Sequence, residues 1–245
     1  MAFVDYQRKG NIVIITLNRP DRLNAMGYEV VERIKDACKK FEEDDEARVA
    51  ILTGTGRAFS AGADVKDFGK PAIVKGAHEV VVAVTKPVIA AVNGMALGGG
   101  CYLTIACDIR IAAESATFGW PEINLAIPVR PERILPQRLP SCVVMELILT
   151  GERITAQRAY EVGLINKVVP DEQLMPAAMK VAERIAGLSP WAVRLTKKAG
   201  TEALALSKED SDKEKEVPIL ARSSEDHNEA VKAFAEKRKP IFKGK

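Results

Sequence analysis

Apolar residues in the first half of the chain follow two alternating patterns. Short β-branched runs at residues 12–17, 49–53 and 88–92 are bounded by turn residues, which predicts buried strands. Between the first two runs, residues 28–41 carry apolar side chains three or four positions apart, which predicts an amphipathic helix, and residues 73–84 read as a second helix. Strands that alternate with helices indicate an α/β layered fold.

After residue 122 the pattern becomes mainly helical. Five segments have the length and apolar spacing of helices, and one short β-branched run predicts a strand. The predicted helices are 141–150, 156–162, 176–186, 190–202 and 225–235, and the predicted strand is 166–169. We therefore expect a core of residues 1–185 followed by a helical region of residues 186–245.

One stretch, residues 86–122, joins a predicted strand to a cluster of glycines and a mainly apolar segment. The triplet Gly98-Gly99-Gly100 lies just before residues 101–107. Backbone N–H groups at the start of a helix have no partner within the helix, and glycine lets a ligand approach them without a Cβ in the way. Such a turn can stabilise negative charge on an oxygen, as acyl chemistry requires. A tight turn that only permits close helix packing fits the spacing equally well.

Charge and composition exclude several classes of function. The 245 residues include 36 basic and 33 acidic side chains, which is no footprint for nucleic acid but suits a small phosphate-bearing molecule. Two histidines and four cysteines show no ligand spacing, so we expect no metal site. Three cysteines lie in apolar surroundings, which favours buried, reduced thiols. Without a signal or transit pattern or a membrane-spanning run, we expect a cytoplasmic protein.

Six sequence blocks follow one another along nearly the whole chain. They are LNRPDRLNA at 17–25, AFSAGADV at 58–65, KPVIAAVNGMALGGGC at 86–101, ACDIRIA at 106–112, ATFGWPEINLA at 116–126 and AFAEKRKPIFKG at 233–244. In this order the blocks resemble the crotonase family, which contains the enoyl-CoA hydratases and isomerases. The resemblance implies a crotonase-like spiral of ββα units, with a C-terminal helical region that forms trimers, and trimers that usually stack as hexamers.

The resemblance also implies the substrate and the residues that hold it. Members of the family bind acyl-CoA thioesters and stabilise an enolate with two backbone N–H groups, which by motif position belong to Ala63 and Gly99. Coenzyme A is then part of the substrate, and no separate cofactor is expected. Phe234 and Lys237 would reach the coenzyme A of a neighbouring subunit, although helix packing and a solvated lysine are alternatives. The residues implied to hold the adenine and pantetheine parts are Leu23, Ala61, Gly62, Asp64 and Val65.

One departure from the family pattern bears on the reaction. Hydratases of the family generally carry two glutamates; here the first position is Tyr102 and the second is Glu122. Adding water requires a base for the water and a proton for C2, a task that two carboxylates share. With one carboxylate, the simplest chemistry is proton transfer between two carbons, as in the family's Δ3,Δ2-enoyl-CoA isomerases. A single-glutamate hydratase or hydratase-lyase on an aromatic or cyclic acyl-CoA stays open.

The role of Tyr102 stays open as well, since it could orient water or the acyl group, or simply line the pocket. A second departure follows Pro128, where many relatives have glycines and this chain has VRPER at 129–133. Glu132 is either a relocated second carboxylate or the partner of a surface arginine. Together these changes leave the acyl group undetermined.

Three other classes of function remain as alternatives. A basic helix face with Arg194, Lys197 and Lys198 could bind RNA, but it has no interleaved aromatic residues and a solvated face explains it more simply. Ser60 and His78 could form a hydrolytic pair, but neither belongs to a nucleophile motif. A catalytically degenerate subunit that binds acyl-CoA without turnover is the third.

Overall fold

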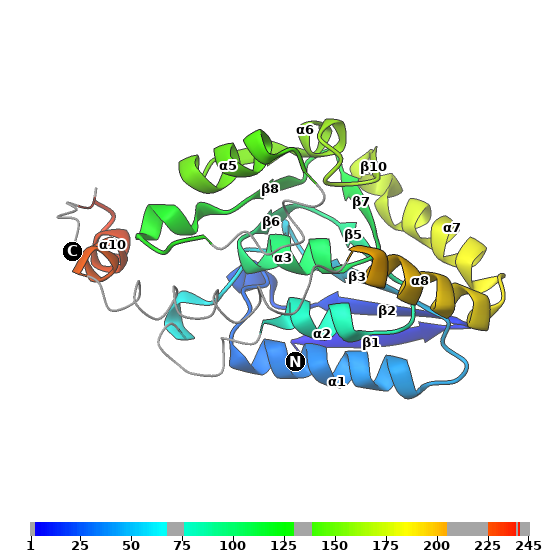
Figure 1. Cartoon of the computed structure of the whole chain (residues 1–245). Coiled ribbons are helices and arrows are strands. Elements are labelled where there is room, and N and C mark those ends of the chain that lie inside the picture. The colour runs from blue at the N-terminus through cyan, green and yellow to red at the C-terminus, as the bar shows by residue number, and fades with distance from the viewer. Residues whose placement is uncertain (1–2, 68–75, 130–138, 205–224, 239, 241–245) are drawn as a thin grey trace. The chain divides into compact units, whose positions relative to one another are not determined.

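The computed structural model describes residues 3–67, 76–129, 139–204, 225–238 and 240 (Figure 1). Its contacts group the chain into two compact units. Unit 1 comprises residues 1–118 and 154–203, and unit 2 comprises residues 119–153 and 204–245. This grouping differs from the division at residue 185 drawn from the sequence pattern, which stays a prediction.

Unit 1 is built on a six-stranded sheet in which the spatial order of the strands equals their order in the chain. The antiparallel pair at one edge is the only exception to a parallel arrangement within this sheet. Parallel strands are buried on both faces, and this explains their continuous apolar runs. The strands are β1 (Val4–Lys9), β2 (Ile12–Leu17), β3 (Val49–Gly54), β5 (Val88–Val92), β7 (Ile109–Ala113) and β10 (Lys167–Val169).

A second, four-stranded sheet in the order β4-β6-β8-β9 was not expected from the apolar pattern. Each of its strands has three residues, too few to display an alternating period. Its parallel pair β4–β6 matters most for function, because the loop after β4 and the glycine triplet after β6 leave this sheet side by side. The strands are β4 (Ala58–Ser60), β6 (Met95–Leu97), β8 (Thr117–Gly119) and β9 (Arg153–Thr155).

The predicted helices of unit 1 are confirmed, with small changes at their ends. Of the predicted helix 73–84, the part before residue 76 lies outside the described residues. Helix α7 covers the main sheet, where its Ala178 and Ala182 pack against Ile51, Ile89 and Ile111 of three neighbouring strands. The helices are α1 (Tyr28–Glu43), α2 (Ala77–Ala83), α3 (Gly99–Ala106), α6 (Ala156–Glu161), α7 (Leu174–Ala186) and α8 (Pro190–Leu204).

Unit 2 contains three described helices: η4 (Pro121–Leu125), α5 (Ser141–Thr150) and α10 (Glu225–Ala235). The short 3-10 helix η4 contacts both of the others. Gly151 ends α5 with a φ of +67°, and a Cβ there would meet Ile123 and Asn124 of η4. Glycine at this position therefore stops the helix and also allows η4 to pack against it.

The mixed α/β fold with parallel strands confirms the expected fold class. Cys38, Cys101 and Cys107 are buried thiols, as predicted, whereas Cys142 is exposed. Burial raises the pKa of the Cys38 thiol to about 11, which keeps it protonated and unreactive at neutral pH. None of the helices within the described ranges is long and apolar enough to cross a membrane.

Candidate functional site

The loop after β4 leaves one backbone N–H group unused. Met26 and Ala63 form an isolated parallel bridge, in which Met26 N donates to Gly62 O at 2.7 Å and Asp64 N donates to Met26 O at 3.2 Å. A bridge of this kind uses the groups on either side of the central residue, so the N–H of Ala63 points away from Met26. Within the described residues, this N–H donates no hydrogen bond.

The first residue of α3 supplies a second open N–H group. Gly99 begins the helix, so its N–H has no acceptor within it. The two open groups are neighbours: an ideal Cβ on Gly99 would lie 3.7 Å from the nitrogen of Ala63, and one on Gly62 would lie 3.2 Å from the nitrogen of Gly99. Two adjacent donors of this kind can bind one oxygen between them.

The glycines around α3 fit both interpretations drawn from the sequence, an accessible N–H group and a tight turn that permits close helix packing. Gly98 has a φ of 52° and a ψ of −120°, a backbone that side-chain-bearing residues avoid. A Cβ on Gly100 would overlap the carbonyl oxygen of Ser60, so this glycine lets α3 pack closely on β4. Gly62 has a φ of +93°, and a Cβ there would lie 2.7 Å from the oxygen of Leu97. Gly98 thus makes the turn, Gly100 allows the close packing, and Gly62 leaves the N–H of Gly99 uncovered.

Tyr102 lies three residues beyond Gly99 on α3, where it takes the place of a carboxylate. Its side chain is partly exposed, and its ring lies 5.7 Å from the ring of His78, measured between centroids, with a tilt of 38°. His78 belongs to α2, the helix that packs next to α3. At position 102, where the family pattern has a glutamate, this chain therefore has an aromatic ring that lies close to the ring of His78.

Glu122 is the second residue of η4 in unit 2. Its Oε2 atom is buried and has no hydrogen-bond partner among the described residues. Burial raises the pKa of this carboxyl to about 7, and the smaller opposing effect comes from its own backbone N–H. A carboxyl with a pKa near neutrality can both accept and donate a proton under physiological conditions, which is what acid/base catalysis requires.

The residues expected to hold coenzyme A are only partly free to do so. Leu23 is half-buried with a left-handed φ of 52°, and its carbonyl accepts a hydrogen bond from Ala61 N at 2.9 Å. The carboxylate of Asp64 is bound within the protein, to Arg19 at 2.8 Å. Val65 starts the short helix η2 (Val65–Asp67). Backbone atoms of this loop, rather than the Asp64 side chain, are therefore the groups left for a ligand.

Phe234 and Lys237 lie at the C-terminal end of α10 in unit 2. The side chain of Phe234 is 66% exposed, and Lys237 is exposed and leaves the helix with a φ of 54°. Ala63, Gly99 and Tyr102 belong to unit 1, whereas Glu122, Phe234 and Lys237 belong to unit 2. Glu132 lies outside the described residues.

Two alternative functions lose support. The hydroxyl of Ser60 is buried, donates to Asn24 O at 2.9 Å and accepts from Gly62 N at 3.2 Å, which suits a structural role and not a nucleophile. In the basic face, Arg194 pairs with Glu42 at 3.0 Å and Lys197 pairs with Asp108 at 2.8 Å, so neighbouring carboxylates neutralise these charges. That face is therefore a weak anchor for phosphates.

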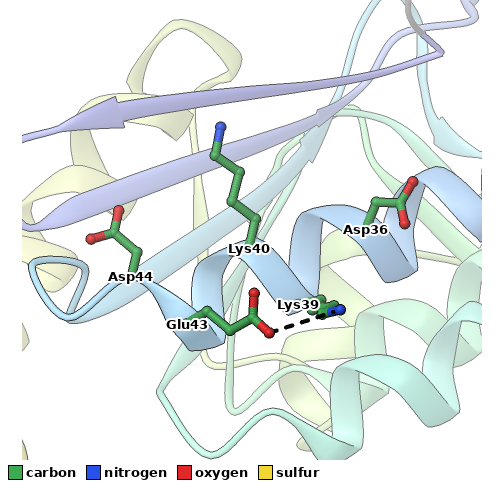
Figure 2. A pocket seen from close by; sticks show the side chains of 5 residues that line it. All are labelled: Asp36, Lys39, Lys40, Glu43 and Asp44. Atoms are coloured by element: carbon green, nitrogen blue, oxygen red, sulfur yellow. Dashed lines mark ion pairs between the residues drawn. The ribbon is translucent and has the colours of Figure 1, made fainter.

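A separate shallow pocket lies along the C-terminal half of α1 (Figure 2). In it Lys39 pairs with Glu43 at 3.9 Å, and the Nζ atom of Lys40 lies 4.3 Å from the centroid of the Tyr6 ring. The other lining residues are Asp36 and Asp44. None of the predicted site residues lines this pocket, and its charges resemble an ordinary solvated helix face.

Sequence reasoning missed the residues that support the Ala63 loop. Arg19 and Met26 contact this loop directly, and Asn24 bonds to Ala58 of β4, the strand that precedes it. Arg19 and Asn24 belong to the block LNRPDRLNA and Met26 follows it, but the block was noted only for its resemblance and for Leu23. The density of turn residues in this block was the available signal, since a turn of that composition needs a partner for its polar groups.

Comparisons with known proteins agree with one another. A family model described as enoyl-CoA hydratase/isomerase matches residues 7–245. A probable mitochondrial enoyl-CoA hydratase of Dictyostelium discoideum is 39% identical, over 98% of this chain and 90% of its own length. A crotonyl-CoA hydratase of Syntrophomonas wolfei is 37% identical, over 96% of both chains. Carnitinyl-CoA hydratase from Mycobacterium avium has a structure that superposes with a TM-score of 0.90 at 35% identity, covering 100% of both chains.

Proposed function

Since the chain belongs to the enoyl-CoA hydratase/isomerase family and is an acyl-CoA enzyme of that type, we propose that Glu122 works in it as the single acid/base carboxylate. The observation that carries this proposal is the buried Oε2 atom of Glu122, which has no partner within the described residues, in a carboxyl whose pKa is raised to about 7. Such a group exchanges protons readily at neutral pH.

The N–H groups of Ala63 and Gly99 form the oxyanion hole in this proposal. Both are open within the described residues and lie next to each other. When a proton is added to or removed from C2 of an acyl-CoA, negative charge develops on the thioester oxygen. Two fixed donors aimed at that oxygen stabilise the enolate more than the neutral thioester, which lowers the barrier.

The first candidate reaction is hydration of a 2-enoyl-CoA, favoured because the relatives compared above are named hydratases. The Glu122 carboxylate takes a proton from water while the oxygen of that water bonds to C3. The π electrons of the C2–C3 bond move to the thioester oxygen, and the resulting enolate takes the proton from Glu122 at C2. One carboxylate therefore suffices, because it only passes a single proton from water to carbon.

The second candidate is isomerisation of a 3-enoyl-CoA, and the presence of Tyr102 favours it. Here Glu122 removes a proton from C2 and returns it to C4, while the double bond moves from C3–C4 to C2–C3. This reaction needs no base for water, so it does not require a second carboxylate at position 102. Crotonyl and carnitinyl groups are the first acyl groups to try, and aromatic or cyclic groups follow.

The deciding experiment compares crotonyl-CoA with a 3-enoyl-CoA, for the wild type and for Glu122→Gln. Hydration of crotonyl-CoA that is lost in the variant supports the first reaction; conversion of the 3-enoyl substrate without added water supports the second. Turnover that is unchanged in Glu122→Gln contradicts the single-carboxylate mechanism. Coenzyme A binding without turnover across an acyl panel identifies a degenerate subunit.

We also propose a homotrimer or homohexamer in the cytoplasm, in which the exposed Phe234 and Lys237 approach the coenzyme A of a neighbouring subunit. Light scattering on the purified protein gives the number of subunits. A Lys237→Ala variant should raise the KM for acyl-CoA several-fold if the lysine meets a phosphate, and a monomer in solution would contradict the arrangement.

A further inference from the structure

A partly buried ion pair involves the residue that follows Ala63. Asp64 follows Ala63 in the chain, and its Oδ2 atom accepts a hydrogen bond from Nη1 of Arg19 at 2.8 Å. Its other oxygen, Oδ1, accepts from Lys66 N at 3.1 Å. The two side chains of the pair are 21% and 10% exposed, so water screens their attraction only weakly. The carboxylate is thus fixed through both of its oxygens.

Arg19 is itself held in place by a rigid turn. Its backbone N donates to Oδ1 of Asn24 at 2.8 Å, and its carbonyl accepts from Asn24 N at 3.0 Å. Asn24 is buried, and its Nδ2 atom donates to Ala58 O at 2.8 Å. The guanidinium group also lies 5.2 Å from the centroid of the Phe3 ring. The pair therefore connects the Ala63 loop to a turn of unit 1 that several hydrogen bonds hold together.

The two hydrogen bonds to Met26 hold the two sides of Ala63 unequally. On the Gly62 side, the bond from Met26 N is 2.7 Å long, and Gly62 N is also bound by Ser60 Oγ. On the Asp64 side, the bridge bond from Asp64 N to Met26 O is 3.2 Å long and at the weak end of the usual range, and the carbonyl of Asp64 accepts only a local bond, from Asp67 N at 2.9 Å. The Arg19–Asp64 pair adds an anchor from a distant segment on this more weakly bridged side.

We propose that Arg19 and Asp64 are a positioning pair that fixes the Ala63 N–H beside the Gly99 N–H. The inference rests on the proposed function, because it assigns the pair to the same oxyanion hole. Neither side chain touches the thioester in this proposal; they act through the backbone of Ala63. The pair should therefore matter most when negative charge develops on the thioester oxygen, and affect kcat more than KM.

The experiment compares Arg19→Gln, Arg19→Lys, Asp64→Asn and the double variant Arg19→Gln/Asp64→Asn. Lys197→Met is the matched control, since it breaks another partly buried ion pair of unit 1, also 2.8 Å long. A misplaced donor can cost about 100-fold in rate, so we expect kcat to fall about 10- to 100-fold in Arg19→Gln and Asp64→Asn, with KM changed less than about threefold. The double variant should be no slower than the slower single variant, because both break one interaction.

A second measurement does not depend on turnover. Butyryl-CoA is saturated and cannot react, and difference infrared spectroscopy reports how strongly its thioester carbonyl is polarised when bound. In the wild type the carbonyl band should move to lower frequency on binding. It should move less in Arg19→Gln and Asp64→Asn, but fully in Lys197→Met and in Glu122→Gln, which keep the donors in place.

The outcomes separate this inference from the proposed function. A full carbonyl shift in folded Arg19→Gln and Asp64→Asn overturns the positioning pair and leaves the oxyanion hole intact. No shift in the wild type overturns the oxyanion hole itself. Losses of kcat and of thermal stability equal to those of Lys197→Met would show a purely structural pair and would also overturn the proposal. Arg19→Lys keeps the buried charge, so it gives a folded protein for the same test if Arg19→Gln does not fold.

Discussion

The Ala63–Gly99 region and the Glu122 region prepare for chemistry in opposite ways. In the first, the reactive groups are backbone N–H groups, and hydrogen bonds of Ser60, Gly62 and Asp64 hold the loop that carries one of them. In the second, the reactive group is one side chain whose buried Oε2 has no partner within the described residues. The Ala63–Gly99 region depends on backbone geometry, and its N–H groups do not titrate. The Glu122 region depends on desolvation of a carboxyl group, and that group does titrate. Substitutions and pH should therefore affect them differently.

The largest effect should come from removing the titrating group. Positioned acid/base groups contribute about 100- to 10,000-fold to rate, so Glu122→Gln should lower kcat by about 1,000-fold while coenzyme A binding is retained. Steady-state kinetics with the better of the two enoyl substrates measures this change. Glu146→Gln, on the exposed face of α5 in the same unit, is the control and should keep wild-type activity. Equal losses in both variants would contradict a specific role for Glu122.

The second-largest effect should come from adding a single methyl group to the Ala63–Gly99 region. In Gly62→Ala the new Cβ would lie 2.7 Å from Leu97 O and 3.2 Å from Gly99 N, so the loop and the donors must move apart. We expect kcat to fall about 100-fold, the cost of losing one donor. Gly163→Ala is a matched control, because Gly163 also has a positive φ, +81°, but no atom lies within 4 Å of the added Cβ. It should lose only stability, by about 1 kcal/mol in chemical denaturation.

The pH dependence of kcat/KM and of thioester carbonyl polarisation should distinguish the Glu122 region from the Ala63–Gly99 region. If deprotonated Glu122 is the base, kcat/KM falls about tenfold for each unit of pH below about 7, whereas the polarisation of a bound thioester carbonyl does not change with it. A pH profile that is flat between 5 and 8 would argue against Glu122 as the base.

The same raised pKa affects stability in a defined direction. The carboxyl has a pKa of about 7 in the folded protein and 4.5 as the reference value, so the folded state binds the proton more tightly. The stability that this tighter proton binding adds to the folded state is fully present below pH 4.5 and is lost as the pH rises through 7. Relative to the wild type, Glu122→Gln should therefore gain stability between pH 4.5 and pH 8, by up to about 3 kcal/mol. Urea denaturation at the two pH values measures this change, and an equal difference at both would contradict the burial of the carboxyl.

The smallest effect should come from the hydroxyl of Tyr102. If the residue lines the pocket together with His78, Tyr102→Phe keeps the ring and changes kcat by less than about threefold. Removing the ring in Tyr102→Ala should then change the preference between short and bulky acyl groups more than the rate with the best substrate. A loss of more than tenfold in Tyr102→Phe would instead assign the hydroxyl to the orientation of water.

The sequence was most informative where apolar periodicity is long. Strands 12–17 and 88–92 and helices 141–150 and 225–235 have the predicted bounds, because burial on one or both faces determines them locally. Strand β1 was missed because only Val4 is buried in this edge strand, and its remaining residues are partly or fully exposed. The three-residue strands of the second sheet depend on pairing with distant segments, which a local pattern does not reveal.

For the candidate site, the family resemblance proposed the N–H groups of Ala63 and Gly99, and glycine spacing indicated only a turn before a helix, but neither indicated the residues that support the Ala63 loop. Arg19 and Asp64 are 45 residues apart in sequence, and neither residue type specifies its partner. The Pro-Glu motif indicated Glu122, yet the burial that shifts its pKa depends on tertiary packing and not on the motif. The sequence could thus propose the identities of the site residues, whereas their electrostatic environment required the fold.

The order of the main sheet has a consequence for how this protein is made. Because β1, β2, β3, β5, β7 and β10 lie side by side in the order of synthesis, each strand emerging from the ribosome can join a neighbour that is already present. The helix that covers this sheet is synthesised after all of its strands. This helix, α7, packs on Ile51, Ile89 and Ile111 and ends at Ala186 (Figure 1). A nascent chain that stops before α7 therefore carries an uncovered apolar surface, of the kind that chaperones bind and that aggregates when translation stalls.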